Sequence, residues 1–237
     1  MRKVKIFLAL AAVLFSFSSC YKLQKDYNRT PHPIDPHINM TAWEYLNARA
    51  NGDNPSDTIF RRMLQGIQYA ELDRSYYEQP NKTYIFLHND AIRRVASNKL
   101  QTDCFFGAHN ANGVTSGLAT NWEDYPKEFV RNYFLYLIVD EVADHYTLPP
   151  ISGKYCKTLA PQGSLSDLPA EVTRVSTAPF EPNPESQMML KVLNSSPSNT
   201  SDYPIMLNEV ITVRTSSILA TNGSIHVIDR FLTTTLP

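Results

Sequence analysis

The order of the hydrophobic patterns along the chain constrains its fold more than any single motif does. Before residue 151, helical patterning begins near Thr41, and apolar side chains recur with helical spacing in segments 56–72 and 126–138. After residue 151, short β-prone runs such as QMMLKVL and PIMLNEVITV alternate with turn-rich stretches. Helices that mainly come first and strands that mainly follow favour an α+β domain over a regular repeat of strands and helices.

Capping residues place the starts of three helices. Ser56 precedes the first apolar stripe, and Pro126 suits the first turn of a second helix whose stripe runs to Ile138. The run TYIFL, residues 83–87, is β-prone, and Asn89 follows it as the expected N-cap of a short helix. Both apolar stripes are predicted to face the core.

The first 19 residues are typical of a signal peptide, with basic MRKVK, apolar IFLALAAVLF and small polar residues in succession. The apolar run is too short to cross a bilayer comfortably. Phe17, Ser18, Ser19 and Cys20 resemble the lipobox of bacterial lipoproteins, although an aliphatic residue usually stands in the place of Phe17. We therefore expect residues 1–19 to be removed and Cys20 to carry lipid; an ordinary secreted protein is the alternative.

A polar segment separates the cysteine from the folded part of the chain. Residues 20–37 contain three prolines, which suppress helix, so we predict a flexible tether there. No internal repeat of fixed period is present, which favours a single domain over residues 38–237. A hydrophobic fraction of 43% and a charged fraction of 19% are compatible with a packed core.

The charge balance argues against nucleic acid as a partner. Removal of the signal peptide takes away Arg2, Lys3 and Lys5, which leaves 19 of the 22 basic side chains against 23 acidic ones. The mature chain is mildly acidic and has no basic run suited to nucleic acid or an anionic lipid surface. The lipid on Cys20 is therefore the expected contact with the membrane.

Two turn-rich segments, near 97–122 and 160–187, are predicted to be insertions into the domain. Loops on a rigid scaffold usually carry recognition, so a ligand is expected to bind there. The candidate ligand contacts are Phe105, Phe106, Trp122 and Tyr125. Burial of these four rings in the core is the alternative.

Cysteine chemistry leaves two possibilities open. If Cys20 carries lipid, Cys104 and Cys156 remain in a compartment where a disulfide is permitted. A bridge between them would close a loop of roughly 50 residues. Two buried free thiols are the alternative.

The stretch NGSIHVIDRFL, residues 222–232, places His226 three residues before Asp229. Asn222 and Gly223 are a turn signal, and the β-branched residues that follow predict a strand. Residues three apart on a strand point to opposite faces of the sheet. His226 and Asp229 are therefore expected to serve the scaffold and not to act as a catalytic or metal-binding pair.

No other motif points to catalysis, a metal or a cofactor, because HExxH, CxxC, GxSxG and a glycine-rich phosphate loop are all missing from the sequence. Asp140, Glu141, Asp144 and His145 cluster at the predicted end of the second long helix. Such side chains could ligate a divalent cation or serve a hydrolase, but a solvated acidic surface is the expected role.

Two segments resemble the signatures of fasciclin-like domains. NGSIHVIDRFL, the closing signature, looks like their terminal pattern of NG, two hydrophobic residues and HVID; TYIFLHNDAI, residues 83–92 and the opening signature, resembles TVFAPTNEAF. A tyrosine matches the Tyr-His position of a helix between them. The matching residues that we assign to the scaffold are Thr83, Asn89, Ala91, Tyr136, Asn222, Gly223, His226 and Asp229.

The resemblance covers residues 38–237. It implies a wedge-shaped β-sandwich of about seven strands with helices packed along one side, in which the two signatures pair as neighbouring central strands. Family members are chiefly adhesion and binding modules on cell surfaces. Leu137 stands in the place of the histidine of the Tyr-His region, which is linked with integrin recognition in animal members. Integrin binding is therefore not inferred.

These patterns together predict a non-enzymatic lipoprotein of a Gram-negative outer membrane, exposed at the cell surface. It would act in adhesion or in binding of a protein or glycan ligand, without cofactor or metal. An alternative is an accessory lipoprotein subunit of a TonB-dependent outer-membrane transporter for glycans or peptides. A hydrolase that uses Asp140, Asp144 or His145 is a third hypothesis.

Overall fold

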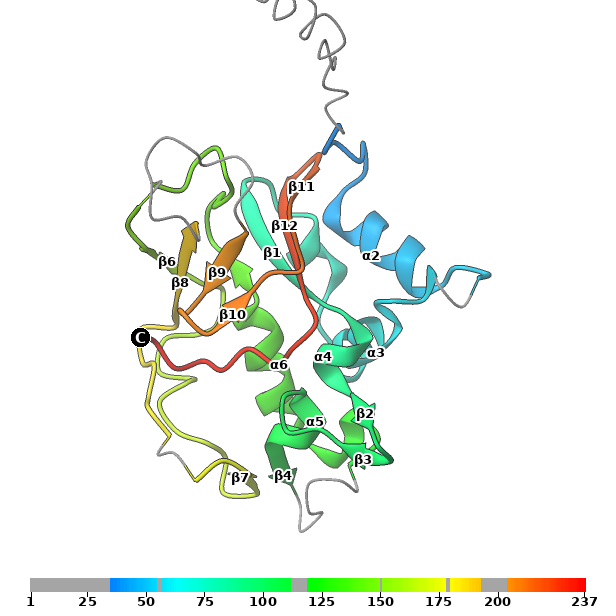
Figure 1. Ribbon diagram of the computed structural model, residues 1–237, viewed down its shortest axis with the longest axis vertical. Helices are drawn as coiled ribbons and strands as arrows, with labels where there is room; N and C mark the ends of the chain where they lie inside the picture. Colours follow the sequence, from blue (N-terminus) through cyan, green and yellow to red (C-terminus); the bar gives the residue numbers. More distant parts are fainter. Residues whose placement is uncertain (1–34, 55–56, 112–118, 150, 178–179, 193–203) are drawn as a thin grey trace, which may run out of the picture. The chain divides into compact units, whose positions relative to one another are not determined.

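A four-stranded sheet in the order β11-β12-β1-β5 contains both signatures. The computed structural model describes residues 35–54, 57–111, 119–149, 151–177, 180–192 and 204–237. β1 (Lys82–Leu87) and β12 (Gly223–Ile228) pair in parallel along their whole length (Figure 1). β11 (Thr215–Ala220) and β5 (Ile138–Val139) flank this pair, both antiparallel to their neighbours. The expected pairing of the two signatures as central strands is confirmed.

A second four-stranded sheet, in the order β10-β9-β8-β6, is antiparallel throughout. Its strands are β6 (Lys154–Lys157), β8 (Gln187–Val192), β9 (Ile205–Leu207) and β10 (Ile211–Thr212). The bridge between Val139 and Thr158 joins β5 of the first sheet to the end of β6. Two short ribbons complete the described strands: β2 (Val95–Ala96) with β3 (Lys99–Leu100), and β4 (His109–Ala111) with β7 (Val172–Arg174).

The helices of the described residues all end before residue 137 and precede the strands of the second sheet, as expected. They are α2 (Ala42–Ala50), α3 (Arg61–Tyr69), α4 (Asn89–Ile92), α5 (Phe105–Ala108) and α6 (Lys127–Tyr136), with 3-10 turns η3 (Arg74–Tyr77) and η4 (Trp122–Asp124). Thr41 caps α2 through a reciprocal bond with Glu44, and α2 packs beside β12 (Figure 1). The mixed organisation is compatible with the predicted α+β class. The expected count of about seven strands is not confirmed, since the described residues form twelve.

Pro126 begins its helix as expected, but two other predicted helix caps were wrong in an informative way. Ser56 lies outside the described residues, and α3 begins at Arg61 with Phe60 at its N-cap position and no side-chain cap of its own. Asn89 caps this distant helix: its Oδ1 accepts from the Arg62 N–H at 3.0 Å, and its Nδ2 donates to the Thr58 carbonyl at 2.7 Å. His88 caps α4 instead. Capping is decided by which helix end lies nearby in space, and sequence spacing does not reveal this.

Helix α6 stops two residues before the predicted end of its apolar stripe. Pro126 is its N-cap and Tyr136 its last residue, and Ile138 already belongs to β5. The carbonyl of Leu137 accepts from the Ile85 N–H at 2.8 Å. The backbone after Tyr136 is therefore bound by β1, which ends the helix although its side chains still suit one.

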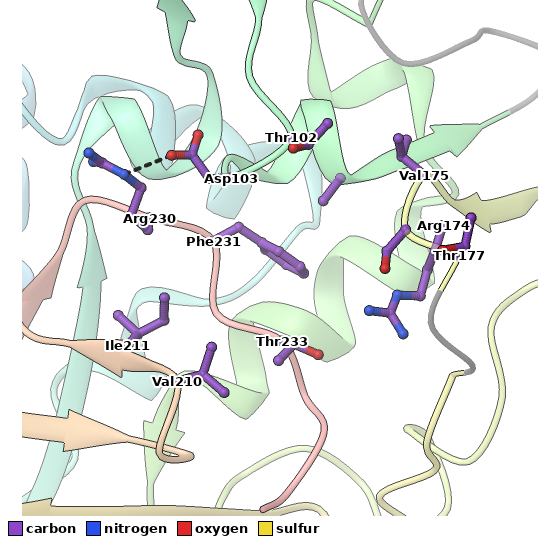
Figure 2. A pocket seen from close by; sticks show the side chains of 12 residues that line it. Thr102, Asp103, Arg174, Val175, Thr177, Val210, Ile211, Arg230, Phe231 and Thr233 are labelled. Carbon is purple, nitrogen blue, oxygen red and sulfur yellow. Dashed lines mark ion pairs between the residues drawn. The ribbon is translucent and has the colours of Figure 1, made fainter.

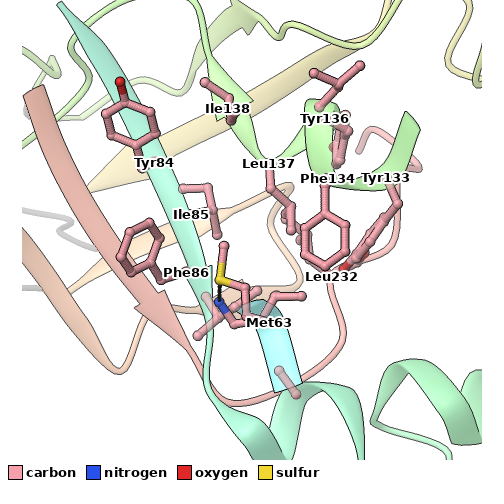
Figure 3. Packing of buried hydrophobic residues seen from close by; sticks show 14 of the residues in the cluster. Met63, Tyr84, Ile85, Phe86, Tyr133, Phe134, Tyr136, Leu137, Ile138 and Leu232 are labelled. Carbon is pink, nitrogen blue, oxygen red and sulfur yellow. Dashed lines mark hydrogen bonds between the residues drawn. The ribbon is translucent and has the colours of Figure 1, made fainter. Parts of the chain in front are cut away.

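Strand β1 is buried on both of its faces. Ile85 points toward Leu137 and Phe134 of the α6 segment, while Tyr84 and Phe86 point to the other side (Figure 3). A strand covered on both sides carries a continuous apolar run, which explains why YIFL does not alternate. The apolar stripe of α3 also faces this core, as predicted, with Phe60, Met63, Leu64 and Ile67 buried and Ile59 packed against them.

The folded unit begins slightly earlier than expected, at Pro36. The Ile38 N–H donates to the Leu219 carbonyl at 3.0 Å, and the Leu219 N–H donates to the Pro36 carbonyl at 2.9 Å. The last residues of the predicted tether are thus attached to β11. Cys20 and the predicted signal peptide lie outside the described residues. Within the described ranges, no helix is long and apolar enough to span a membrane.

Candidate functional site

His226 is a fully buried scaffold residue in β12. The Ser217 N–H donates to its Nδ1 at 3.0 Å, and its Nε2 donates to the Ala143 carbonyl at 2.8 Å. This pattern fits the neutral ring protonated on Nε2. Burial lowers the pKa of His226 to about 4, because charging the ring inside the core is unfavourable. Both ring nitrogens are therefore occupied by backbone.

Thr83, the first residue of the opening signature, has a similar role. Its hydroxyl accepts from the Ala143 N–H at 2.7 Å and donates to the Glu141 carbonyl at 2.8 Å. Thr83 is completely buried, so these bonds satisfy its hydroxyl without water. The segment that follows β5 is thereby attached to both central strands.

Asn222 joins three parts of the fold. Its Oδ1 accepts from the Ala42 N–H at 2.8 Å, at the start of α2. Its Nδ2 donates toward the carbonyls of Tyr77 and Gln79 at 2.9 and 3.1 Å and the Tyr84 hydroxyl at 3.0 Å. This buried amide holds α2, η3 and β1 against the turn that begins β12.

Gly223 is required by close approach of the two central strands. A Cβ atom on Gly223 would lie 2.0 Å from the carbonyl oxygen of Lys82, which is backbone and cannot rotate away. Any other residue here would push β1 and β12 apart at their first pair. The Asn-Gly pair of the closing signature thus has two roles: Asn222 forms hydrogen bonds to three parts of the fold, and Gly223 leaves room for the Lys82 carbonyl.

Asp229 does not share its partners with His226. Its carboxylate lies 3.2 Å from Arg230 and 3.6 Å from Arg214, in half-buried ion pairs beyond the end of β12. His226 and Asp229 therefore bind different groups, as the strand geometry led us to expect. Tyr136 and Ala91 are buried, and the Tyr136 hydroxyl accepts from Asn208 Nδ2 at 2.7 Å.

The acidic cluster follows β5 and does not cap a helix end, which corrects the expected placement. Asp140 pairs with Lys82 at 2.6 Å, and Glu141 pairs with Lys154. Asp144 is buried and accepts from the N–H groups of Tyr146 and Thr147 at 2.9 and 3.1 Å. No group of three metal-ligating side chains occurs in the described ranges.

One contact of catalytic appearance was not expected from sequence. The Ser217 Oγ lies 2.6 Å from His145 Nδ1, the separation of a nucleophile from its base. Ser217 has a φ of 55° at the irregularity in β11, and only 8% of it is exposed. The same hydroxyl accepts from the His145 N–H at 3.3 Å. We interpret the contact as the attachment of β11 to the segment after β5.

The four aromatic residues predicted to contact a ligand are buried. Exposed fractions are 0% for Phe105, 1% for Phe106, 3% for Trp122 and 1% for Tyr125. Their polar atoms are also engaged: Trp122 Nε1 donates to the Arg62 carbonyl at 2.8 Å and the Tyr125 hydroxyl to the Phe106 carbonyl at 3.1 Å. The insertion near 97–122 thus contributes aromatic core, and these rings have almost no surface for a ligand.

The two cysteines are buried free thiols, so the disulfide left open by the sequence is not formed. Cys104 precedes α5, where its Sγ donates to the Gln101 carbonyl at 3.0 Å. Cys156 lies in β6, and burial together with the nearby Glu141 raises the pKa of its thiol to about 12. Neither thiol has the lowered pKa of a reactive cysteine.

A cleft of about 660 Å³ lies where the two insertions meet the C-terminal segment, and we call it the insertion cleft (Figure 2). The insertion near 97–122, the insertion near 160–187, the β9–β10 turn with β10, and the segment after β12 each contribute to it. The lining residues are Thr102, Asp103, Ala108, Arg174, Val175, Ser176, Thr177, Val210, Ile211, Arg230, Phe231 and Thr233.

The walls of the insertion cleft are held together by bonds between its segments. Arg230 Nε lies 2.9 Å from Asp103, and the Phe231 N–H donates to the Asp103 carbonyl at 2.9 Å. The Val175 N–H donates to the Ala108 carbonyl at 2.9 Å, which joins the second insertion to the first. The cleft is therefore a braced part of the fold.

The floor of the cleft is aromatic. The Phe231 ring projects into the cleft between Arg230 and Arg174 (Figure 2), and its centre lies 5.6 Å from that of Phe105 and 5.0 Å from that of His109. His109 is 4% exposed and burial lowers its pKa to about 4. Phe105, one of the four aromatic residues predicted to contact the ligand, thus lies beneath the cleft and packs against the ring that reaches it.

The sequence pointed to two of the segments that form the cleft but not to the residues that line it. Arg230 and Phe231 lie near the end of the closing signature and come shortly after β12 ends. A charged residue and a large aromatic residue just beyond a strand are a signal that the sequence offered. Val210 and Ile211 carry no such signal, because only pairing of the second sheet brings them near the insertions.

Comparison with known proteins adds nothing to these observations. No model of a protein family matches the chain, and no curated protein matches it at a significant level. The α+β organisation and the insertion cleft therefore rest on the geometry itself.

Proposed function

We propose that the protein is a lipid-anchored fasciclin-like module of the cell envelope that binds a protein or glycan ligand in the insertion cleft without catalysing a reaction. Cys20 would carry the lipid. Its sequence context resembles a lipobox, and the folded unit begins at Pro36, so residues 20–35 are available as a spacer. A surface-exposed outer-membrane location is part of this proposal.

The observation that carries the proposal is the position of the insertion cleft. The segments that we expected to be additions to the basic domain contribute to its lining, and it lies beside the end of β12, because Arg230 and Phe231 come shortly after that strand. A braced hollow of about 660 Å³ lies within the size range of ligand sites in proteins. Recognition by loops on a rigid scaffold is the usual arrangement for binding proteins.

The fasciclin-like assignment is supported by the central sheet. The opening and closing signatures lie in adjacent parallel strands, and their matching residues Thr83, Asn222 and His226 bind backbone groups of neighbouring segments. This is the scaffold role that the resemblance implies. We further propose that the two four-stranded sheets correspond to the layers of the fasciclin-like wedge.

A binding role is also supported by what the polar signature residues do. The hydroxyl of Thr83 and both nitrogens of His226 are bound to backbone, so catalysis with these groups would require breaking the scaffold. Asp144 and His145, named in the hydrolase hypothesis, are likewise engaged in the segment after β5.

The anchor is tested by growing cells with a clickable fatty acid and following its incorporation. We expect label on the wild-type chain, none on Cys20→Ser, and unchanged label on Cys104→Ser as the matched control. Protease added to intact cells should digest the wild-type chain, as expected for a surface-exposed protein. Label that persists in Cys20→Ser would rule out the proposed anchor.

Binding is tested separately with the full-length chain extracted in mild detergent. Glycan and extracellular-protein arrays should show ligands for the wild-type chain that are lost when Val210→Glu places a charge in the cleft. Val210 is 59% exposed, so this change should leave the fold intact. Tyr146→Glu, at a residue that is 76% exposed and outside the cleft lining, is the control. Stoichiometric co-purification of a β-barrel partner would favour the transporter-subunit alternative.

A further inference from the structure

The insertion cleft offers a specific combination of groups. Its floor carries one partly exposed aromatic ring, Phe231, and its walls carry the ion pair of Arg230 with Asp103. Four hydroxyl side chains also line it, namely Thr102, Ser176, Thr177 and Thr233. A ligand that matches this lining needs an apolar face and a belt of groups that both donate and accept hydrogen bonds.

We propose that the insertion cleft binds a neutral sugar chain, with one sugar ring stacked on Phe231 and its hydroxyls bonded to the Arg230–Asp103 pair. This inference rests on the proposed function, because it names the ligand class for the same cleft. A pyranose ring has an apolar C–H face and hydroxyls around its edge. Those hydroxyls can accept from the guanidinium of Arg230 and donate to Oδ2 of Asp103 side by side, since Asp103 Oδ1 is buried.

The pairing of Arg230 favours a neutral ligand over a strong anion at that end of the cleft. Arg230 already lies between two carboxylates, 2.9 Å from Asp103 and 3.2 Å from Asp229. Asp103 in turn also pairs with Arg94. A phosphate or sulfate bound to Arg230 would lie close to both carboxylates and be repelled by them, whereas a sugar hydroxyl can bond to the pair as it stands. The pair also fixes the direction of its donors and acceptors before a ligand arrives.

The strands beside the cleft argue against a peptide added as a further strand. β10 borders the cleft through Ile211, and it is the edge strand of its sheet. It contains only two residues, Ile211 and Thr212. Binding by strand addition relies on a row of main-chain hydrogen bonds, and so short an edge provides little of one. Side-chain recognition of an extended sugar chain is better matched to the lining.

Size and shape agree with a short chain of sugar units. A cleft of about 660 Å³ is larger than one sugar ring needs and is open to solvent along its length, since Thr102, Ser176 and Thr177 are exposed at its rim. Val210 and Ile211 extend the apolar surface beyond Phe231 (Figure 2). Additional sugar rings can pack there through their C–H faces.

The test uses the full-length chain in mild detergent and an array of short neutral oligosaccharides, followed by calorimetry on those that bind. We expect Thr102→Val with Thr177→Val, which removes two rim hydroxyls at constant shape, to weaken binding about tenfold or more. The matched control is Thr212→Val with Thr215→Val, two exposed threonines outside the lining, which should bind as the wild type does.

A second variant tests stacking. Phe231→Leu keeps an apolar side chain of similar reach but removes the ring, and it should weaken oligosaccharide binding by a comparable factor while circular dichroism confirms the fold. Val210→Glu provides an independent check at an exposed position, in case Phe231→Leu perturbs the aromatic floor. Loss of affinity in both the rim and the stacking variants supports the inference.

Three outcomes overturn it: no neutral oligosaccharide binds, binding is unchanged in the cleft variants, or sulfated glycans bind through the cleft in preference to neutral ones. The same protein preparation is also applied to an extracellular-protein array, which shows whether only the sugar-chain inference is wrong or the proposed binding function as well. Protein binding that depends on Val210 would leave the binding role standing with a different ligand. If neither the oligosaccharide array nor the protein array shows binding, the proposed binding function is wrong as well.

Discussion

Thr83 in β1 and His226 in β12 bind the two sides of a single residue, Ala143. The threonine hydroxyl accepts from the Ala143 N–H at 2.7 Å, and the imidazole Nε2 donates to the Ala143 carbonyl at 2.8 Å. The opening signature and the closing signature therefore meet through a residue that belongs to neither. Their polar side chains attach the segment after β5 to the central strand pair.

This shared partner predicts coupled effects on stability. His226→Ala should lower the free energy of unfolding by about 3–4 kcal/mol, because it leaves a cavity and two buried backbone groups without partners. Thr83→Val should cost about 1–3 kcal/mol for the loss of its two bonds. Urea denaturation of both single variants and the double variant measures their coupling, and an additive double variant would show that the attachment of Ala143 is not shared.

Stability should depend on pH through two buried histidines. Burial lowers the pKa of both His226 and His109 to about 4, below the ordinary value of 6.5. The unfolded chain therefore binds more protons between these values, and the stabilisation is complete above pH 6.5 and lost as the pH falls through about 4. The loss in the free energy of unfolding is on the order of 3 kcal/mol for each histidine.

Denaturation curves between pH 7 and 4 test this dependence. His226→Gln should reduce the slope, and His37→Gln, at the exposed start of the folded unit, is the matched control. A slope that is the same in wild type and His226→Gln would assign the pH dependence to other groups.

The contact between Gly223 and Lys82 predicts a steric effect. Gly223→Ala places a methyl group against the Lys82 carbonyl, so the parallel strands must separate locally at a cost of about 1–3 kcal/mol. Thr221→Ala, in the same turn but exposed, should have little effect and serves as the control. Thermal melts are sufficient to separate these two outcomes.

The contact between Ser217 and His145 allows a test of whether Ser217 is a structural residue or a nucleophile. We expect Ser217→Ala to lower stability by about 1 kcal/mol, and we expect a fluorophosphonate probe to leave Ser217 unlabelled in the folded protein. Labelling at Ser217 that disappears in His145→Ala would revive the hydrolase hypothesis. Ser216→Ala, the same substitution at the neighbouring and less buried position of β11, is the matched control for the stability measurement.

The free thiols give a chemical prediction. Cys104 and Cys156 are buried, and burial raises the pKa of each. A thiol reagent should therefore react slowly with both in the native protein and quickly after addition of denaturant. Reductant should leave the melting temperature unchanged, and a lowered melting temperature would indicate that the two cysteines form a bridge.

Local and neighbouring patterns predicted much of the scaffold. The start of a helix near Thr41, the core-facing stripe of α3 and the strand character of NGSIHVIDRFL depend on residues close in sequence, and all are present. The pairing of β1 with β12 came from the family resemblance. It could not have come from periodicity, because 135 or more residues separate the two strands.

Failures of prediction share a physical cause. Asn89 caps a helix other than its own, Ile138 leaves a helix for a strand, and Phe105 sits in the core instead of at a surface. In each case a tertiary partner overrides a local preference, and the sequence does not say which partner is near. The insertion cleft could not be foreseen for the same reason, since four separate segments must meet to form it.

The attachment of the chain at β11 has a mechanical consequence. If lipid holds one end of the tether and a ligand holds the cleft, tension from the membrane enters the folded unit where Pro36 and Ile38 bond to Leu219. These two bonds would be the first to bear load and could detach alone, which would lengthen the spacer by a few residues. Asn222, bonded to the start of α2, would then carry the tension into the parallel strands β1 and β12.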